Sequence, residues 1–428
     1  MATRRTGKVL LKDLLKVNWK EFRYEHDRAR PQVPKLLRTI RDETGEEQDN
    51  AIDELYRVLL YYGRRFPGTV AAIPFIFELV EDPGTAARGA ILRVLISLAA
   101  GMSNSVDYSS PDEWIDTGCS RALLRLAFEA RVRAGEQTPA DMESGIATYD
   151  AIAQRIPSLA SLVRSTDENE RRWASFVAPW FLDEHEPFTA AMRKQWSKEP
   201  VADIKAAQIL SLSYVAPLSE RELKPYLSSG DANLRMAAAF SLVRTRSSAL
   251  QEGLDVLRDF AKQEDAIPTD EHRTVVEAHD WYPWAMLNSF WRPLLISHDE
   301  ALLNAEFERL KPRYQKRLRA KYPRYMLALA FLAQPGHALA IRAAMDDLIS
   351  PAAIDSKFRY ELQRNGGWTG GLTPLQRRAL TTLASFDEAW LEGSNNYMGT
   401  ILSEWGFPNS QAALLEFLAS HPAKHSPS

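Results

Sequence analysis

The sequence predicts an all-α protein, built as an array of stacked helix pairs with a helical cap at each end. A segment recurs three times in which an apolar run ends at Pro or Asp, and an Arg then opens a second apolar run. Within each run the apolar residues follow helical spacing, and strand patterns are scarce. Because such helix pairs bury their apolar faces against their neighbours, the recurrence favours an open helical array.

The first copy shows why the repeating unit is a helix pair. Between residues 70 and 80, the apolar residues lie three and four positions apart, which places them on one helical face. These residues are Ile73, Ile76, Phe77 and Val80. Pro83 and Gly84 then end the helix, and Thr85 can cap the next one. That second helix, from about Ala86 to Ala100, is apolar over most of its circumference, as expected inside an array.

The later copies are irregularly spaced. They contain Pro157, Asp167 and Arg172 in the second copy, and Pro225, Asp231 and Arg235 in the third. Arg88 and Arg172 are 84 residues apart, which is about two periods of 40–47 residues. One helix pair should therefore intervene, and helical patterns over residues 114–132 and 146–156 supply it. The step from Arg172 to Arg235 is 63 residues, which fits three helices rather than four.

The third copy, at residues 230–244, resembles the HEAT-type repeats, in particular the bacterial subclass shared with PBS-lyase-like proteins. In that family an Asp before the second helix and an Arg that opens it form a ladder between stacked units. The resemblance implies this repeat-stabilising role for Asp82, Arg88, Asp167, Arg172, Asp231 and Arg235, whose separations within each pair are 6, 5 and 4. It covers roughly residues 50–260 and implies a fold and a binding function rather than a reaction.

This interpretation divides the chain into four parts. They are a basic amino-terminal helical cap or arm (1–44), the HEAT-like array (45–265), an aromatic- and basic-rich helical continuation (266–365), and a Gly-rich link with a carboxy-terminal helical cap (366–428). In the last part, Thr373 caps a helix that begins at Pro374. A final amphipathic helix is expected over residues 412–418.

Composition limits the class of protein. Of the 428 residues, 45% are hydrophobic and 25% charged, as is typical of globular proteins. The longest apolar runs, such as residues 89–101, are too short to span a bilayer, so no membrane partner is predicted. The single cysteine, Cys119, cannot form an intrachain disulfide and has no His or Lys beside it, which predicts a buried structural thiol and a cytoplasmic protein.

Charge is unevenly distributed. Residues 1–41 hold twelve Lys or Arg and four acids, an excess of +8, so the remainder of a chain with net charge −3 carries −11. Such an arm could bind an anionic partner or fold back onto its own array. Its apolar stripe (Leu10, Leu11, Leu14, Leu15 and Val17) favours a capping helix with a solvated basic face.

A second basic run occupies residues 311–325, where seven basic residues and three tyrosines occur without an acid. Basic side chains neutralise phosphates and tyrosines stack on bases, so the run is a candidate site for nucleic acid or another polyanion. The anion-binding candidates are Lys311, Arg313, Lys316, Arg317, Arg319, Lys321 and Arg324.

Residues 270–292 form the densest remaining candidate site. Its aromatic residues are of the types that anchor protein interfaces, although core packing explains them as well. The interaction candidates are Trp281, Tyr282, Trp284 and Trp291. His272 and His279, with Asp280, are the candidate metal ligands, but helical metal sites more often use a spacing of three or four. We therefore predict no metal and no cofactor.

No catalytic constellation is evident in the sequence. We expect a protein-binding helical-repeat scaffold, adaptor or neutralising partner without its own catalytic centre. One alternative is an enzyme or enzyme accessory on the same array, either cofactor-lyase-like or a metal-dependent protein modifier. Another is a nucleic-acid or polyanion binder.

Overall fold

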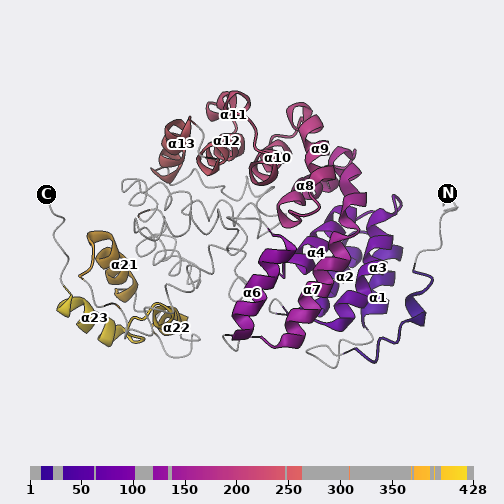
Figure 1. Ribbon diagram of the computed structural model, residues 1–428, viewed down its shortest axis with the longest axis horizontal. Coiled ribbons are helices and arrows are strands. Elements are labelled where there is room, and N and C mark those ends of the chain that lie inside the picture. Colours follow the sequence, from indigo (N-terminus) through magenta and orange to yellow (C-terminus); the bar gives the residue numbers. More distant parts are fainter. Residues whose placement is uncertain are drawn as a thin grey trace. The chain divides into compact units, whose positions relative to one another are not determined.

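The computed structural model describes residues 11–22, 32–61, 64–101, 119–133, 137–245, 248–262, 308, 368, 371–385, 390 and 397–421. These residues are mostly helical (Figure 1), which confirms the all-α prediction. The chain divides into two compact units, one of residues 1–114 and 118–222 and the other of residues 115–117 and 223–428. The finer division into four parts stays a prediction. None of the described helices has both the length and the apolar character that a membrane span requires.

The first unit contains most of the described helices. They are η1 (Leu14–Lys16), α1 (Gln32–Asp42), α2 (Glu46–Leu59), α3 (Pro67–Glu81), α4 (Arg88–Ala100), α6 (Arg121–Arg133), α7 (Pro139–Ala153), η3 (Ile156–Arg164), α8 (Glu168–Ser175), η4 (Ala178–Trp180), α9 (Glu186–Gln195), η5 (Trp196–Lys198) and α10 (Ala202–Val215), where η denotes a 3-10 helix. Two short strands, β1 (Leu60–Tyr61) and β2 (Arg64–Arg65), pair antiparallel, with Leu60 opposite Arg65.

Successive helices of the first unit pack as pairs. α1 contacts α2, α3 contacts α4, η3 contacts α8, and α9 contacts α10. The second members contact one another in the order α2, α4, α8 and α10. Among the first members, α1 contacts α3 and η3 contacts α9, while Arg155 next to η3 forms an ion pair with Glu81 of α3 at 2.9 Å. Each described pair therefore lies against the next.

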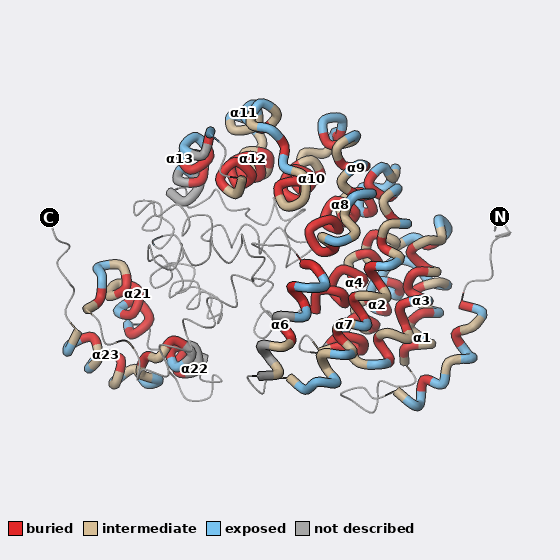
Figure 2. Tube along the Cα trace, viewed as in Figure 1, coloured by how far each residue is buried: buried red, intermediate tan, exposed pale blue. Residues whose placement is uncertain are grey.

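The pair α3 and α4 follows the predicted pattern, and Figure 2 shows buried positions along most of α4. All four apolar residues predicted for the face of α3 are buried. α4 ends at Gly101, whose φ of 74° lies in the left-handed region that glycine tolerates at a helix terminus. The expected cap was wrong: α4 starts after Ala87, and the Thr85 hydroxyl is buried without a hydrogen-bond partner.

α6 and α7 are the predicted helices between the first two copies in the chain, with limits that differ from the prediction. They do not separate the two copies in space, because α4 contacts α8 directly. α7 starts at Pro139 because Thr138 caps it, and the Thr138 amide donates to Asp141 Oδ2 at 2.8 Å. α7 contacts both α3 and α4 as well as α6. The ring of Phe128 in α6 lies so close to Gly145 that an added Cβ would be 2.2 Å from its Cζ, so a larger residue there would require the ring to move.

The amino-terminal segment folds back onto the first unit, but the expected capping helix is not formed by its described residues. Between residues 11 and 22 the helix is limited to η1. Leu11 and Leu14 are buried, whereas Leu15 of the same predicted stripe is exposed. The buried residues of the segment are Leu11, Leu14 and Trp19, three and five positions apart, and only the single turn η1 between them is helical.

α11 (Glu220–Leu227) starts in the first unit and ends in the second. The other described helices of the second unit are α12 (Ala232–Arg244), α13 (Leu250–Lys262), α21 (Pro374–Ala384), α22 (Tyr397–Glu404) and α23 (Gln411–Ser420). α12 packs on α13, and α21 packs on α23. The predicted start of α21 is confirmed, because Gln376 N donates to Thr373 Oγ1 at 3.2 Å. The predicted closing helix is confirmed as α23.

Candidate functional site

Most of the sequence-predicted binding residues lie outside the described part of the chain. This applies to the aromatic interaction candidates (Trp281, Tyr282, Trp284 and Trp291), to the anion-binding candidates (Lys311, Arg313, Lys316, Arg317, Arg319, Lys321 and Arg324), and to His272, His279 and Asp280. They stay predictions. The described candidates are the six repeat-stabilising residues, and the structure shows what each of them contacts.

Two of the three predicted aspartates cap the second helix of their unit. Asp167 Oδ1 accepts a hydrogen bond from Glu170 N at 2.9 Å at the start of α8. Asp231 Oδ1 accepts one from Leu234 N at 2.9 Å at the start of α12. Each carboxylate thereby satisfies an amide that the first helical turn leaves unpaired.

Asp82 differs from these two aspartates. It directly follows the last residue of α3 and lies six residues before Arg88. Its carbonyl oxygen accepts a hydrogen bond from the Thr85 amide at 3.0 Å. α4 has no side-chain cap, so an aspartate caps the second helix in two of the three copies. The ladder between units that the resemblance implies for these aspartates stays a prediction.

The arginine that matches Arg235 is Arg171 rather than the predicted Arg172. Arg171 Nη1 donates to Ser165 O at 2.9 Å, and Arg235 Nη1 donates to Ser229 O at 2.6 Å. Both arginines lie four residues after a capping aspartate and six after a serine. Arg172 Nε is instead buried without a hydrogen-bond partner. The equal Asp-to-Arg spacing was visible in the sequence and could have identified Arg171.

The serines of the two turns also match. Ser165 Oγ accepts a hydrogen bond from Asp167 N at 3.1 Å, and Ser229 Oγ accepts one from Asp231 N at 3.1 Å. Measured from serine to serine, the two turns are 64 residues apart. One seven-residue pattern, a serine, an aspartate two positions later and an arginine four further on, therefore forms the same turn twice.

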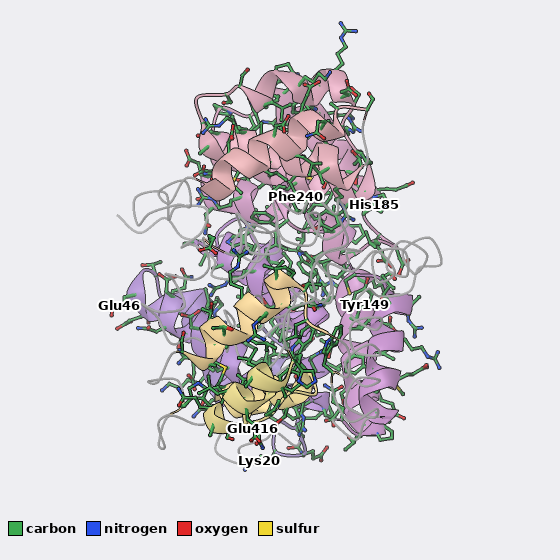
Figure 3. All side chains as sticks on the ribbon, turned by 90° about the vertical axis from the view of Figure 1, so that its left-hand side faces the viewer. Lys20, Glu46, Tyr149, His185, Phe240 and Glu416 are labelled. Atoms are coloured by element: carbon green, nitrogen blue, oxygen red, sulfur yellow. The ribbon has the colours of Figure 1, made fainter. Side chains whose placement is uncertain are left out.

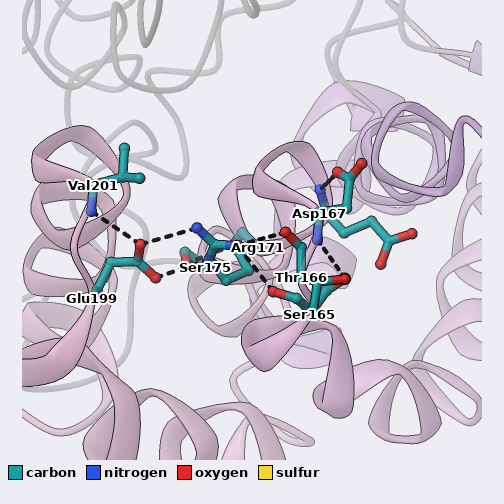
Figure 4. Close-up of polar contacts among 8 residues, drawn as sticks. Ser165, Thr166, Asp167, Arg171, Ser175, Glu199 and Val201 are labelled. Carbon is teal, nitrogen blue, oxygen red and sulfur yellow. Dashed lines mark hydrogen bonds and ion pairs between the residues drawn. The ribbon is translucent and has the colours of Figure 1, made fainter.

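Arg171 also links two helix pairs (Figure 4). Its Nε and Nη2 donate to the two carboxylate oxygens of Glu199 at 3.0 and 3.3 Å, across the boundary between α8 and the start of α10. Glu199 Oε1 also accepts the Val201 amide at 3.2 Å, and Arg171 Nη1 donates to Thr166 O at 3.2 Å. The side chains are 10% and 0% exposed, so this bidentate pair is desolvated and its polar groups are bonded within the protein.

A second ion pair links α4 to α8. Arg88 Nη1 lies 3.1 Å from Glu170 Oε1, and Arg88 Nε donates to Val80 O at 2.8 Å at the end of α3. Gly89, beside it, allows close approach, because an added Cβ would lie 2.8 Å from Asn169 O. Together, Arg88–Glu170 and Arg171–Glu199 connect the helix pairs α3/α4, η3/α8 and α9/α10 through adjacent residues of α8.

The sequence interpretation missed Glu170 and Glu199. Glu170 lies within the first turn of α8, where an acid is common for dipole reasons, so its pairing with Arg88 gave no local signal. Glu199 is 28 residues from Arg171. An ion pair at that separation depends on how the helices pack, which one sequence does not reveal.

Cys119 is buried, as predicted, and its backbone joins two segments: its amide donates to Pro179 O at 2.7 Å and its carbonyl accepts the Leu182 amide at 3.0 Å. Burial raises the pKa of the Cys119 thiol. Burial likewise raises the pKa of the Tyr149 hydroxyl, whose ring stacks on Phe181. A protonated thiol is a poor nucleophile, so these groups act as core.

His185, which is labelled in Figure 3, precedes Glu186 at the start of α9. Its Nδ1 makes a local hydrogen bond with Thr189 Oγ1 at 2.9 Å. In the part of the chain that the structure describes, no three His, Cys, Asp or Glu side chains gather in a way that could hold a metal ion.

Comparisons with protein-family models, with curated proteins and with solved structures gave no match for this chain. The described polar features are two largely buried Arg–Glu ion pairs between helix pairs, two matching capped turns and a buried thiol.

Proposed function

We propose that this chain is an irregular α-solenoid of HEAT-like helix pairs that binds another protein, as a scaffold, adaptor or neutralising partner without its own catalytic centre. The observation that carries the proposal is the order of contacts in the first unit, where the pairs α1/α2, α3/α4, η3/α8 and α9/α10 pack one against the next, and α7 lies against α3 and α4. In repeat arrays the units contact only their neighbours, and the surface they share is long enough to hold a protein partner.

The polar contacts support the HEAT-like part of the proposal. The resemblance implies a ladder of Asp and Arg between stacked units. The described ion pairs between helix pairs are Arg88 with Glu170 and Arg171 with Glu199, while Asp167 and Asp231 cap helices. The same turn recurs before α12, as expected of a repeating unit. The single buried cysteine is compatible with the cytoplasmic location that we propose.

The test is capture of a partner by the tagged full-length chain from native extract, identification by mass spectrometry, and reconstitution of a binary complex from purified proteins. We expect a stoichiometric complex that survives gel filtration. Recovery of chaperones alone, or failure of every recovered protein to bind after purification, would contradict the proposed function.

The same complex locates the binding surface. Replacing Trp281 and Tyr282 with Ala should weaken the affinity by at least about tenfold, because aromatic anchors dominate interface energetics. Leu415→Ala is the control, since Leu415 is an exposed apolar side chain on α23, 50% accessible to solvent. An unchanged affinity of the aromatic double variant would remove residues 281–291 from the proposed surface.

A further inference from the structure

The segment of residues 11–22 is held against α3 by its apolar side. Leu14 is fully buried, and Trp19 Nε1 donates to Leu14 O at 2.9 Å. The Trp19 ring lies 6.0 Å, centroid to centroid, from Phe75 of α3. Leu11, which has the uncommon φ of 59° for a leucine, donates its amide to Glu78 Oε2 of α3 at 2.7 Å. These contacts fix which side chains of the segment point away from the helices.

The opposite side of the segment combines lysines with one exposed leucine. Lys12, Lys16 and Lys20 are exposed, and Lys20 lies near the lower edge of the view in Figure 3. Glu21 is also exposed and accepts a hydrogen bond from Asn18 Nδ2, so the segment holds three lysines against two acids. Leu15 is 74% exposed, and in the described part of the chain Leu415 is the other large hydrophobic side chain with such exposure. Asp13 pairs with Lys16 at 2.7 Å, but both groups are exposed and the pair is open to exchange with another anion.

The charge of the chain reinforces this surface. Residues 1–41 carry an excess of +8, and the remaining residues carry −11. A chain with this asymmetry turns its basic end toward a negatively charged surface and its acidic part away from it. The lysines of residues 11–22 lie within that basic end.

We propose that residues 11–22 bind the surface of an anionic lipid bilayer, with the lysine ammonium groups at the headgroups and the Leu15 side chain between them. Lysine stems are apolar and place the charge at the interface, and an aliphatic side chain gains by leaving water there. A nucleic acid would use exposed aromatic rings for stacking, yet Trp19 of this segment is buried. An acidic protein could pair with the lysines, but its acidic side chains would give the apolar Leu15 side chain no favourable contact.

This inference goes beyond the proposed function, because neither the helix-pair contacts nor the aromatic stretch take part in it. It also qualifies the expectation of no membrane partner. That expectation rested on the length of apolar runs, which excludes a span but does not address binding at the surface.

The experiment measures binding of the full-length protein to phosphatidylcholine vesicles with and without phosphatidylglycerol, by sedimentation and by tryptophan fluorescence. We expect binding that needs phosphatidylglycerol and weakens with salt. Each lysine near an anionic surface contributes about fivefold in partition coefficient, so Lys12→Glu with Lys20→Glu should lower it by at least about 25-fold. Leu15→Ser should lower it by about tenfold.

Matched controls separate this surface from net charge and from general hydrophobicity. Lys194→Glu with Lys198→Glu changes the charge equally at exposed positions of α9 and η5, and Leu415→Ser removes the other exposed leucine. Both controls should bind as the parent does. All substituted side chains are exposed, and circular dichroism verifies that each variant is folded.

Three results would overturn the inference. The parent protein could fail to bind anionic vesicles. Both lysine pairs could have the same effect, which would indicate net charge alone. Leu15→Ser could bind normally while duplex DNA or polyglutamate competes the vesicles away, which would indicate a polyanion surface instead of a lipid surface.

Discussion

The turn that opens α8 and the turn that opens α12 are built alike, yet their helices meet their surroundings differently. In both turns, the serine hydroxyl oxygen accepts a hydrogen bond from the aspartate amide, and the aspartate side chain caps the helix. The arginine side chain donates a hydrogen bond to the serine carbonyl oxygen. The third helical residue is Glu170 in α8 and Leu234 in α12. Glu170 pairs with Arg88, whereas Leu234 is buried as an apolar side chain. The conformation of the turn is thus determined by residues within the turn. The contact with a neighbouring helix depends on the third helical residue, which differs between α8 and α12.

The strongest test of this comparison is Arg171→Ala. It leaves the fully buried Glu199 carboxylate with one remaining hydrogen bond, from Val201 N. Removing one member of a buried pair costs about 3–5 kcal/mol, because the other charge stays desolvated. We expect a lower urea midpoint and faster hydrogen exchange in α8 and the start of α10.

Arg172→Ala is the matched control for Arg171→Ala, because it removes an adjacent guanidinium that Arg235 does not match. It should cost clearly less, within the range of about 1 kcal/mol found for ordinary substitutions. A larger loss for Arg172→Ala than for Arg171→Ala would contradict the equivalence of Arg171 with Arg235.

The second test converts one turn toward the other. Arg88→Leu alone leaves Glu170, which is 8% exposed, without its partner and should cost about 2–4 kcal/mol. Glu170→Leu alone leaves Arg88 with its bond to Val80 O. If the two turns are interchangeable, Arg88→Leu combined with Glu170→Leu should recover most of the loss, since an apolar pair can replace a buried ion pair.

A double-mutant cycle of denaturation free energies measures this recovery. Additive losses in the double variant would contradict a direct coupling of Arg88 and Glu170, and would also weaken the view that α8 and α12 differ only in the residue chosen for this contact.

The third test concerns what the turns share. Asp167→Ala and Asp231→Ala remove caps of the same geometry, so each should cost about 1 kcal/mol, and Asn at either position should restore most of it. Asp82→Ala, which removes no cap, should cost less. Hydrogen exchange of the first turns of α8 and α12 reports the two losses separately. Unequal losses would show that the two turns are not equivalent.

Local signals explain why much of the fold was predictable. The apolar spacing of α3 and the start of α21 at Pro374 with its cap at Thr373 depend on residues within one turn of each other. Arg172 was chosen because it opens the apolar run of the second copy. Arg171 is the residue that, like Arg235, lies four positions after the capping aspartate. Glu199, 28 residues from Arg171, was out of reach, since only packing brings the two together.

The candidate binding residues also show that sequence alone does not reveal which residues lie around a given side chain. The aromatic stretch with Trp281 and the basic run with Arg317 were found by composition, which identifies residue types but not their surroundings. They lie outside the described residues and stay predictions. The exposed Leu15 was predicted to belong to a helical apolar stripe, and its exposure became evident only when the segment was seen against α3.

The smallest expected effect comes from Glu184, which follows the Cys119-linked segment and, unlike Glu170 and Glu199, faces other acids. Burial, with Asp183 and Asp150 adding to it, raises the pKa of the Glu184 carboxyl. Because the folded-state pKa lies above the unfolded value, ionisation costs stability as pH rises through the folded pKa, and the cost persists at neutral pH.

Glu184→Gln should remove this pH dependence. Since the side chain is partly exposed and solvent screens it, the gain at neutral pH should be about 0.5 kcal/mol or less, measured as a shift of the urea midpoint at neutral pH that vanishes in acid. A loss of stability at neutral pH would instead mean that the carboxylate makes a favourable contact, as Glu199 does with Arg171.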